Sequence, residues 1–97
     1  MFCINVLLTV KEVENVPTVR DCLAEIVKQT VGVEEGCLRL EVYQSQTEER
    51  KFLLCEHWKD KAAWEGHREE PPFIEIYLEK VLPLVDREPH ISDLVAS

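Results

Sequence analysis

Two strands joined by a turn can be recognised in the stretch Cys37-Leu-Arg-Leu-Glu-Val-Tyr-Gln44, Ser45-Gln-Thr-Glu-Glu-Arg50, Lys51-Phe-Leu-Leu-Cys-Glu-His-Trp58. In the first part, leucine or valine recurs at every second position, which is the period of a half-buried strand. The polar middle part predicts a hairpin loop. In the last part, Phe52, Leu54, Glu56 and Trp58 share one face. The stretch therefore predicts an antiparallel β-hairpin.

Helices and further strands are expected on both sides of this hairpin. Residues 2–10 are almost continuously apolar, which indicates a central strand. Asn15 is a candidate cap for a helix with one apolar stripe, and Asp60 for a short helix through Arg68. Pro71 and Pro72 open another helix, and a last short strand is expected over residues 91–96. The stripes are Val16, Val19, Leu23, Ile26, Val27 and Thr30 in the first helix, and Phe73, Ile76, Tyr77, Lys80, Val81 and Leu84 in the last.

The order strand, helix, strand, strand, helix, strand predicts an α+β, ferredoxin-like βαββαβ fold with an antiparallel sheet. The 97 residues form a single domain. Helices can cover only one face of the sheet, and the other face is expected to keep apolar side chains. Homodimerisation through this second face is the simplest way to cover it. Its expected members are Cys3, Leu7, Cys37, Tyr43, Leu53 and Cys55.

Composition excludes several classes of function. A net charge of -8 disfavours nucleic acids and anionic membrane surfaces as partners. No run reaches the roughly 18 apolar residues of a membrane span, and no signal peptide is recognised, so we expect a cytoplasmic protein. The four cysteines form no C-x-x-C pair and no metal-ligating cluster, so no metal site is indicated. No glycine-rich loop indicates a nucleotide or a flavin.

The candidate reactive groups are few. His67, near the end of a short helix, fits either a charge favoured by the helix dipole or a general acid or base. Asn5 and Glu56 are polar groups on predicted central strands and need partners, and Glu56 could act as an acid, a base or an orienting carboxylate. Tyr77, Trp58, Trp64 and Phe73 fit either core packing or a ligand wall. Arg39 most simply forms an interface ion pair with Glu41.

Three ordered segments resemble the antibiotic biosynthesis monooxygenase family, which includes quinol monooxygenases. They are Glu35-Gly-Cys-Leu-Arg-Leu-Glu-Val42, Glu56-His-Trp-Lys-Asp-Lys-Ala-Ala63, and His67 followed by Pro72-Phe73. The resemblance covers about residues 3–96. It implies a dimeric α+β barrel of two ferredoxin-like subunits. It also implies oxygenation of electron-rich aromatic substrates by O₂ without metal, flavin or haem. No cofactor is therefore expected, and O₂ is a co-substrate.

By this resemblance, a pocket between sheet and helices would hold the reactive groups. His67 would move a proton, Asn5 and Tyr77 would polarise substrate oxygens, and the aromatic residues would clamp the ring. Another relative isomerises a phosphorylated sugar, and for such a ligand Arg39, Arg68 and Lys80 would be the basic groups. A haem-degrading branch also has an asparagine on its first strand, as Asn5 is here. His67 and Tyr77, however, stand where that branch has its tryptophan and its haem ligand, which argues against haem.

The sequence therefore predicts a cofactor-independent monooxygenase acting on a small aromatic, quinol-like substrate. Two alternatives stay open. One is an isomerase or another proton-transfer enzyme that uses the same pocket on a small metabolite. The other is a dimeric protein that binds a small ligand without turnover.

Overall fold

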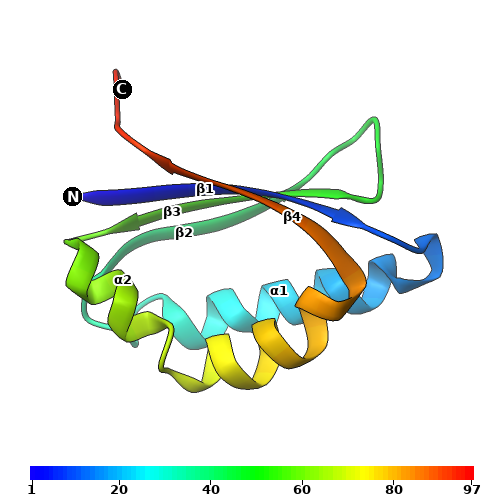
Figure 1. Cartoon of the computed structure of the whole chain (residues 1–97), viewed down its shortest axis with the longest axis horizontal. Helices are drawn as coiled ribbons and strands as arrows, with labels where there is room; N and C mark the ends of the chain where they lie inside the picture. Colours follow the sequence, from blue (N-terminus) through cyan, green and yellow to red (C-terminus); the bar gives the residue numbers. More distant parts are fainter.

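A computed structural model describes all residues 1–97 and confirms the predicted α+β, ferredoxin-like fold (Figure 1). Three helices follow the predicted order among four strands. The strands are β1 (Phe2–Val10), β2 (Cys37–Gln44), β3 (Lys51–Trp58) and β4 (Val85–Ser92). The helices are α1 (Val16–Thr30), α2 (Lys61–His67) and η2 (Pro72–Val81), and the short turns η1 (Val13–Asn15) and η3 (Leu82–Leu84) precede α1 and β4.

The sheet is antiparallel, with the strands in the order β2-β3-β1-β4. The helices lie together on one side of it, and the other side is uncovered in the monomer (Figure 1). The register of β1 places Val6 opposite Leu54 of β3 on one side and opposite Pro89 of β4 on the other. Because side chains alternate between the two faces of a strand, this register decides which residues lie under the helices.

The core lies between the sheet and the helices. The even-numbered residues from Ile4 to Val10 in β1 are buried, as are those from Phe52 to Trp58 in β3. The predicted stripe of α1 is confirmed, with Val16, Val19, Leu23, Ile26 and Thr30 buried. Asn15 takes the N-cap position of α1, but its side chain makes no capping hydrogen bond.

The start of β2 differs from the predicted alternation. The pairing shifts between Cys37 and Arg39, which leaves Leu38 in a bulge with 59% of its surface exposed. A bulge places one extra residue opposite a single partner and so reverses the alternation on one side of it. Cys37 consequently packs against the core, whereas the sequence pattern placed it on the uncovered face. The rest of β2 keeps Leu40 buried against the helices, as predicted.

The last strand begins earlier than predicted. It runs from Val85 to Ser92, whereas the sequence favours residues 91–96. Pro89 is typical of an exit loop, but it lies within the strand opposite Val6. β4 is an edge strand that pairs only with β1, and an edge strand tolerates a proline whose missing N–H would face solvent.

The helices after the hairpin begin and end near the predicted signals. Asp60 caps α2, since its Oδ1 accepts a hydrogen bond from the N–H of Ala63 at 2.8 Å. η2 follows the double proline and is wound as a π-helix, with the N–H of Leu82 donating to the carbonyl of Tyr77. Tyr77 and Val81 of its predicted stripe are buried. None of the helices has the length and apolar character needed to cross a membrane.

The two glycines Gly36 and Gly66 provide a matched test of how α2 packs against the turn before β2. A Cβ at Gly36 would overlap the Cβ of Ala63, whereas a Cβ at Gly66 meets no atom within 4 Å. We expect Gly36→Ala to lower the free energy of unfolding by about 1–3 kcal/mol through overpacking. Gly66→Ala should raise it by up to about 1 kcal/mol, because alanine favours the helix. Urea unfolding of both variants measures this, and equal stability of G36A and the wild type would contradict the close contact.

Candidate functional site

A largely apolar cavity lies between the sheet and the helices. Its wall is built by apolar residues of α1, β2 and β3, including Leu23, Ile26, Leu40 and Leu54. Five polar residues also line it, namely Glu56, His67, Arg68, Tyr77 and Arg87. An apolar enclosure with a few convergent polar groups is the usual form of a small-molecule site.

The carboxylate of Glu56 lies on the floor of this cavity. It is 8% exposed, and its Oε1 accepts a hydrogen bond from the indole N–H of Trp58 at 3.1 Å. Burial raises the pKa of Glu56 above the ordinary value of 4.5, while the hydrogen bond from Trp58 and the proximity of His67 partly oppose this. A carboxyl group with a raised pKa can exchange a proton closer to neutral pH than an exposed one.

His67 is a buried imidazole held on several sides. Its Nδ1 lies 2.7 Å from Oε1 of Glu34, in the turn between α1 and β2. Its ring packs against Trp58 at 4.6 Å between centroids, and edge-on against Phe73 at 5.7 Å. The side chain is thus held in one orientation at the cavity wall. This is the place predicted for His67 from the sequence.

Tyr77 and Arg87 form a second polar pair in the cavity. The Nε of Arg87, on β4, donates a hydrogen bond to the Tyr77 hydroxyl oxygen at 2.9 Å. This leaves the hydroxyl proton of Tyr77 free to be donated to another group. Burial raises the pKa of Tyr77, and the charge of Arg87 and its hydrogen bond oppose the shift. The pair therefore offers a neutral O–H donor backed by a positive charge.

Aromatic side chains form the outer part of the cavity. Phe73 stacks on Tyr77 with centroids 5.4 Å apart, and Phe2 stacks on Trp64 at 4.9 Å. The guanidinium of Arg68 lies over both Trp64 and Phe73, at 5.1 and 5.4 Å from the ring centroids. Arg68 is exposed and Trp64 and Phe73 are partly exposed, so these three lining side chains reach the surface of the molecule.

Of the eight predicted site residues, Glu56, Trp64, His67, Phe73 and Tyr77 line the cavity. Trp58 does not, and the expectation that it clamps a substrate ring is corrected. It is 1% exposed and lies against His67 and Glu56, so it supports these groups from behind.

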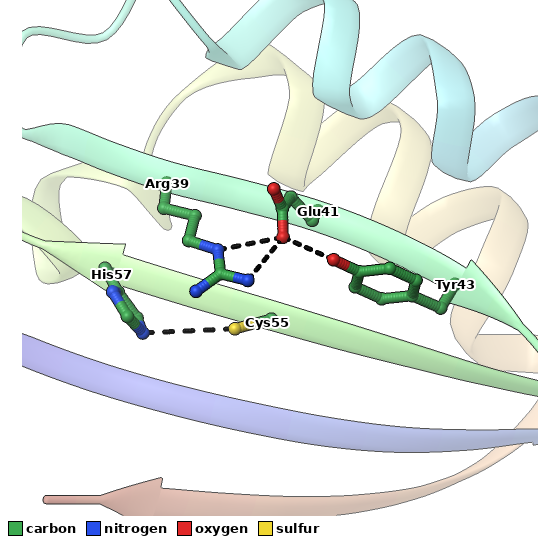
Figure 2. Close-up of polar contacts among 5 residues, drawn as sticks. All are labelled: Arg39, Glu41, Tyr43, Cys55 and His57. Atoms are coloured by element: carbon green, nitrogen blue, oxygen red, sulfur yellow. Dashed lines mark hydrogen bonds and ion pairs between the residues drawn. The ribbon is translucent and has the colours of Figure 1, made fainter. Parts of the chain in front are cut away.

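Asn5 and Arg39 do not lie in the cavity, contrary to the predicted pocket. Asn5 pairs with Cys55 and His90 and points to the uncovered face, where its Nδ2 donates to Oγ of Ser92 at 3.2 Å. Arg39 lies on the same face, as Figure 2 shows with the helices behind the sheet. The reason is the alternation of side chains, which puts these odd-numbered residues opposite the buried even-numbered ones.

The uncovered face carries a polar cluster of its own (Figure 2). Oε1 of Glu41 accepts hydrogen bonds from the Tyr43 hydroxyl at 2.6 Å and from Nε of Arg39 at 2.8 Å, which confirms the predicted ion pair between Arg39 and Glu41. Both hydrogen bonds lower the pKa of Glu41, and the one from the Tyr43 hydroxyl has the larger effect. Nearby, Sγ of Cys55 lies 3.9 Å from Nε2 of His57.

Two residues of the site were missed in the sequence. Glu34 lies in a turn, where carboxylates are common and usually solvated. Its proximity to the Glu35-Gly36-Cys37 segment was the only signal. Arg87 lies in a segment whose prolines suggest a loop, so the sequence did not predict that this residue belongs to a strand and faces the cavity. No group of three or more histidine, cysteine, aspartate or glutamate side chains is arranged to hold a metal ion.

Comparisons with known proteins agree with this architecture. A family model described as "Antibiotic biosynthesis monooxygenase" matches residues 1–77. No curated protein matches the chain.

Several solved structures have the same fold. One antibiotic biosynthesis monooxygenase superimposes with a TM-score of 0.84 at 21% identity, covering 97% of this chain and 99% of that chain. A candidate antibiotic biosynthesis monooxygenase from Deinococcus radiodurans gives 0.83 at 24% identity, covering 100% and 95%. A Bacteroides thetaiotaomicron protein of unknown function, described as a possible oxidoreductase, gives 0.85 at 21% identity and 94% of both chains. At these identities the likeness shows the fold alone.

The buried carboxyl of Glu56 makes stability depend on pH in a predictable direction. Because its pKa is raised in the folded state, the folded protein binds more protons than the unfolded chain between pH 4.5 and the raised pKa. Stability is therefore lost as the pH rises through this window. The amide introduced by Glu56→Gln is neutral throughout and can still accept from Trp58. We expect this variant to gain in free energy of unfolding relative to the wild type as the pH rises, measured by urea unfolding across the window.

Glu48 supplies the control for this experiment. It is exposed, and its ion pair with Lys51 lowers its pKa. The contribution of its carboxylate to the stability of the fold is therefore present above pH 4.5 and is lost as the pH falls through the lowered pKa. Glu48→Gln should show no gain with rising pH. A Glu56→Gln curve that parallels that of Glu48→Gln would contradict the burial cost assigned to Glu56.

Proposed function

We propose that this chain, which belongs to the antibiotic biosynthesis monooxygenase family, is a monooxygenase that oxidises a small quinol-like aromatic with O₂ and no bound cofactor. The observation that carries the proposal is the set of polar groups within one apolar cavity: His67 paired with Glu34, the buried carboxyl of Glu56, and Tyr77 backed by Arg87. These groups can take a proton from a phenol and hold the oxyanion that results.

The reaction balances without a further reductant. A quinol and O₂ give a hydroxyquinone and water: one oxygen atom enters the ring, the other leaves as water, and the quinol supplies the electrons. His67 accepts the proton of a quinol hydroxyl and leaves the electron pair on a phenolate, which O₂ can oxidise. Tyr77 donates its O–H to the substrate oxygen that carries the negative charge, and the positive charge of Arg87 favours that state.

A substrate must open the cavity to enter it. The volume of the cavity is only ≈ 30 Å³. Small-molecule sites usually measure about 300–1,000 Å³. Trp64, Phe73 and Arg68 form the outermost layer, so their movement is the simplest route of entry. Aromatic rings that part around the substrate would then stack on it.

Oxygen uptake with a panel of reduced quinols and anthrone-like aromatics tests this function. We expect a rate well above spontaneous oxidation in the wild type. His67→Gln should lower kcat/KM by about 100-fold or more, which is the usual contribution of a general base. Tyr77→Phe should lower it by about 100-fold, through loss of an oxyanion donor.

His90→Gln is the matched control, because His90 is exposed on β4 and lies outside the cavity. Its rate should equal that of the wild type. A wild-type rate no faster than spontaneous oxidation across the panel would refute the monooxygenase. Turnover without O₂ consumption would point to the isomerase class.

We further propose that the protein is a homodimer joined through the uncovered sheet face. That face exposes Leu53 and Tyr43, at 48% and 50% of their surfaces, next to the Arg39–Glu41 pair. A sheet face with exposed apolar side chains in its centre is an unfavourable surface for a monomer. A second copy would cover it with the same residues by two-fold symmetry.

Light scattering at micromolar concentration should give twice the mass of the chain. Leu53→Asp places a charge in the centre of the face, so we expect it to yield a monomer. Leu78→Asp is the control, since Leu78 is similarly exposed, at 40%, but lies on η2 away from that face. A monomeric wild type, or an equal effect of both substitutions, would contradict the interface.

A further inference from the structure

Glu34 is a mostly buried carboxylate that lies behind His67. Its side chain is 12% exposed and that of His67 is 6% exposed, and the 2.7 Å contact between Oε1 and Nδ1 joins them. Glu34 does not line the inner cavity. It lines an outer hollow of ≈ 310 Å³, formed by the turn before β2 and by α2. His67 lines both spaces and separates them.

The contact with Glu34 distinguishes the two ring nitrogens of His67. An ionised carboxylate can only accept hydrogen bonds. Nδ1 of His67 therefore carries the proton and donates a hydrogen bond to Glu34. Nε2 is then the unprotonated nitrogen available to a substrate in the cavity. Packing against Trp58 and Phe73 restricts rotation of the ring, so this orientation is kept.

Other ionisable groups face this pair from each neighbouring element. Glu56 of β3 interacts electrostatically with both His67 and Glu34. Glu35 and Glu70 line the outer hollow, Cys37 lies near Glu34, and Arg68, Tyr77 and Arg87 line the inner cavity. Of all these groups, Glu34 is the one that contacts the His67 ring through a hydrogen bond.

We propose that Glu34 is the positioning residue of the reaction: it fixes the tautomer in which Nε2 of His67 is the base, and it stabilises the imidazolium that forms. This inference rests on the proposed monooxygenase function. The quinol hydroxyl gives its proton to Nε2, and the electron pair stays on the phenolate oxygen. The imidazolium then lies between the phenolate and the Glu34 carboxylate. It later returns the proton to the peroxy oxygen formed from O₂, so the pair ends in its starting state.

Kinetics of Glu34 variants test this role. Glu34→Gln keeps the shape but loses the charge, and we expect kcat to fall at least about tenfold while KM changes little. Glu34→Asp should recover part of the rate. Glu34→Ala opens the outer hollow, so added formate should raise its rate with saturation, since formate can take the place of the missing carboxylate. Glu70→Gln is the control, because Glu70 lines the same hollow, is exposed and contacts His67 only through its backbone N–H, which the substitution keeps.

The outcomes separate a positioning role from a structural one. A merely structural Glu34 would show no recovery with formate and an unchanged pH profile of kcat in Glu34→Gln. An equal loss of rate in Glu70→Gln would also overturn the proposal, because general electrostatics would then account for it.

A measurement without substrate separates this proposal from the proposed function. The ¹⁵N chemical shifts of His67, assigned with His67→Gln, report its tautomer at a pH where the ring is neutral. We expect the Nδ1–H form in the wild type and a mixture in Glu34→Ala. An Nε2–H form in the wild type would overturn the positioning role even if O₂ is consumed. The Nδ1–H form without O₂ uptake would support the pair and refute the monooxygenase.

Discussion

The pairing of β1 with β3 is the constraint on which the other features depend. It aligns Ile4 with Glu56 and Val6 with Leu54, so one face of the two central strands is buried under the helices. Since side chains alternate, the same pairing sends Asn5 and Cys55 to the other face. A slip by one residue would exchange the two sets and place the Glu56 carboxylate in solvent. The register therefore fixes both the core and the floor of the cavity.

Three polar residues that line the cavity each have a hydrogen-bond partner. An isolated buried charge or donor costs several kcal/mol, and a partner recovers most of this cost. Trp58 supplies a donor to Glu56, Glu34 lies on Nδ1 of His67, and Arg87 donates to Tyr77. Each pair leaves one reactive atom for the cavity. The same contacts that make burial tolerable therefore hold these side chains in place at the cavity wall.

The two faces of the sheet are suited to different tasks. The helix-covered face encloses the cavity, and the aromatic side chains of Trp64, Phe73 and Tyr77 help to line it. The uncovered face carries an exposed hydrogen-bonded row, Arg39, Glu41 and Tyr43 (Figure 2). Leu53 is exposed on the same face. Charged groups arranged in this way specify the orientation of a partner more than they strengthen its binding. A substitution on one face should therefore leave the function of the other largely intact.

Local sequence patterns determined the order of the elements, the stripe of α1, the Asp60 cap and the inward face of β3, because each depends on residues close together in the chain. The resemblance to the family, rather than any local pattern, indicated that His67, Glu56, Trp64, Phe73 and Tyr77 share a pocket. Only the tertiary structure showed which groups pair with His67 and Tyr77. Glu34 lies 33 residues from His67 in the chain, and Arg87 lies on β4, which Pro89 made difficult to recognise as a strand. The tertiary structure also moved Asn5 and Arg39 out of the site. The periodicity of a strand separates its two faces, but a hydrogen-bond partner that is distant in the chain leaves no periodic signal in the sequence.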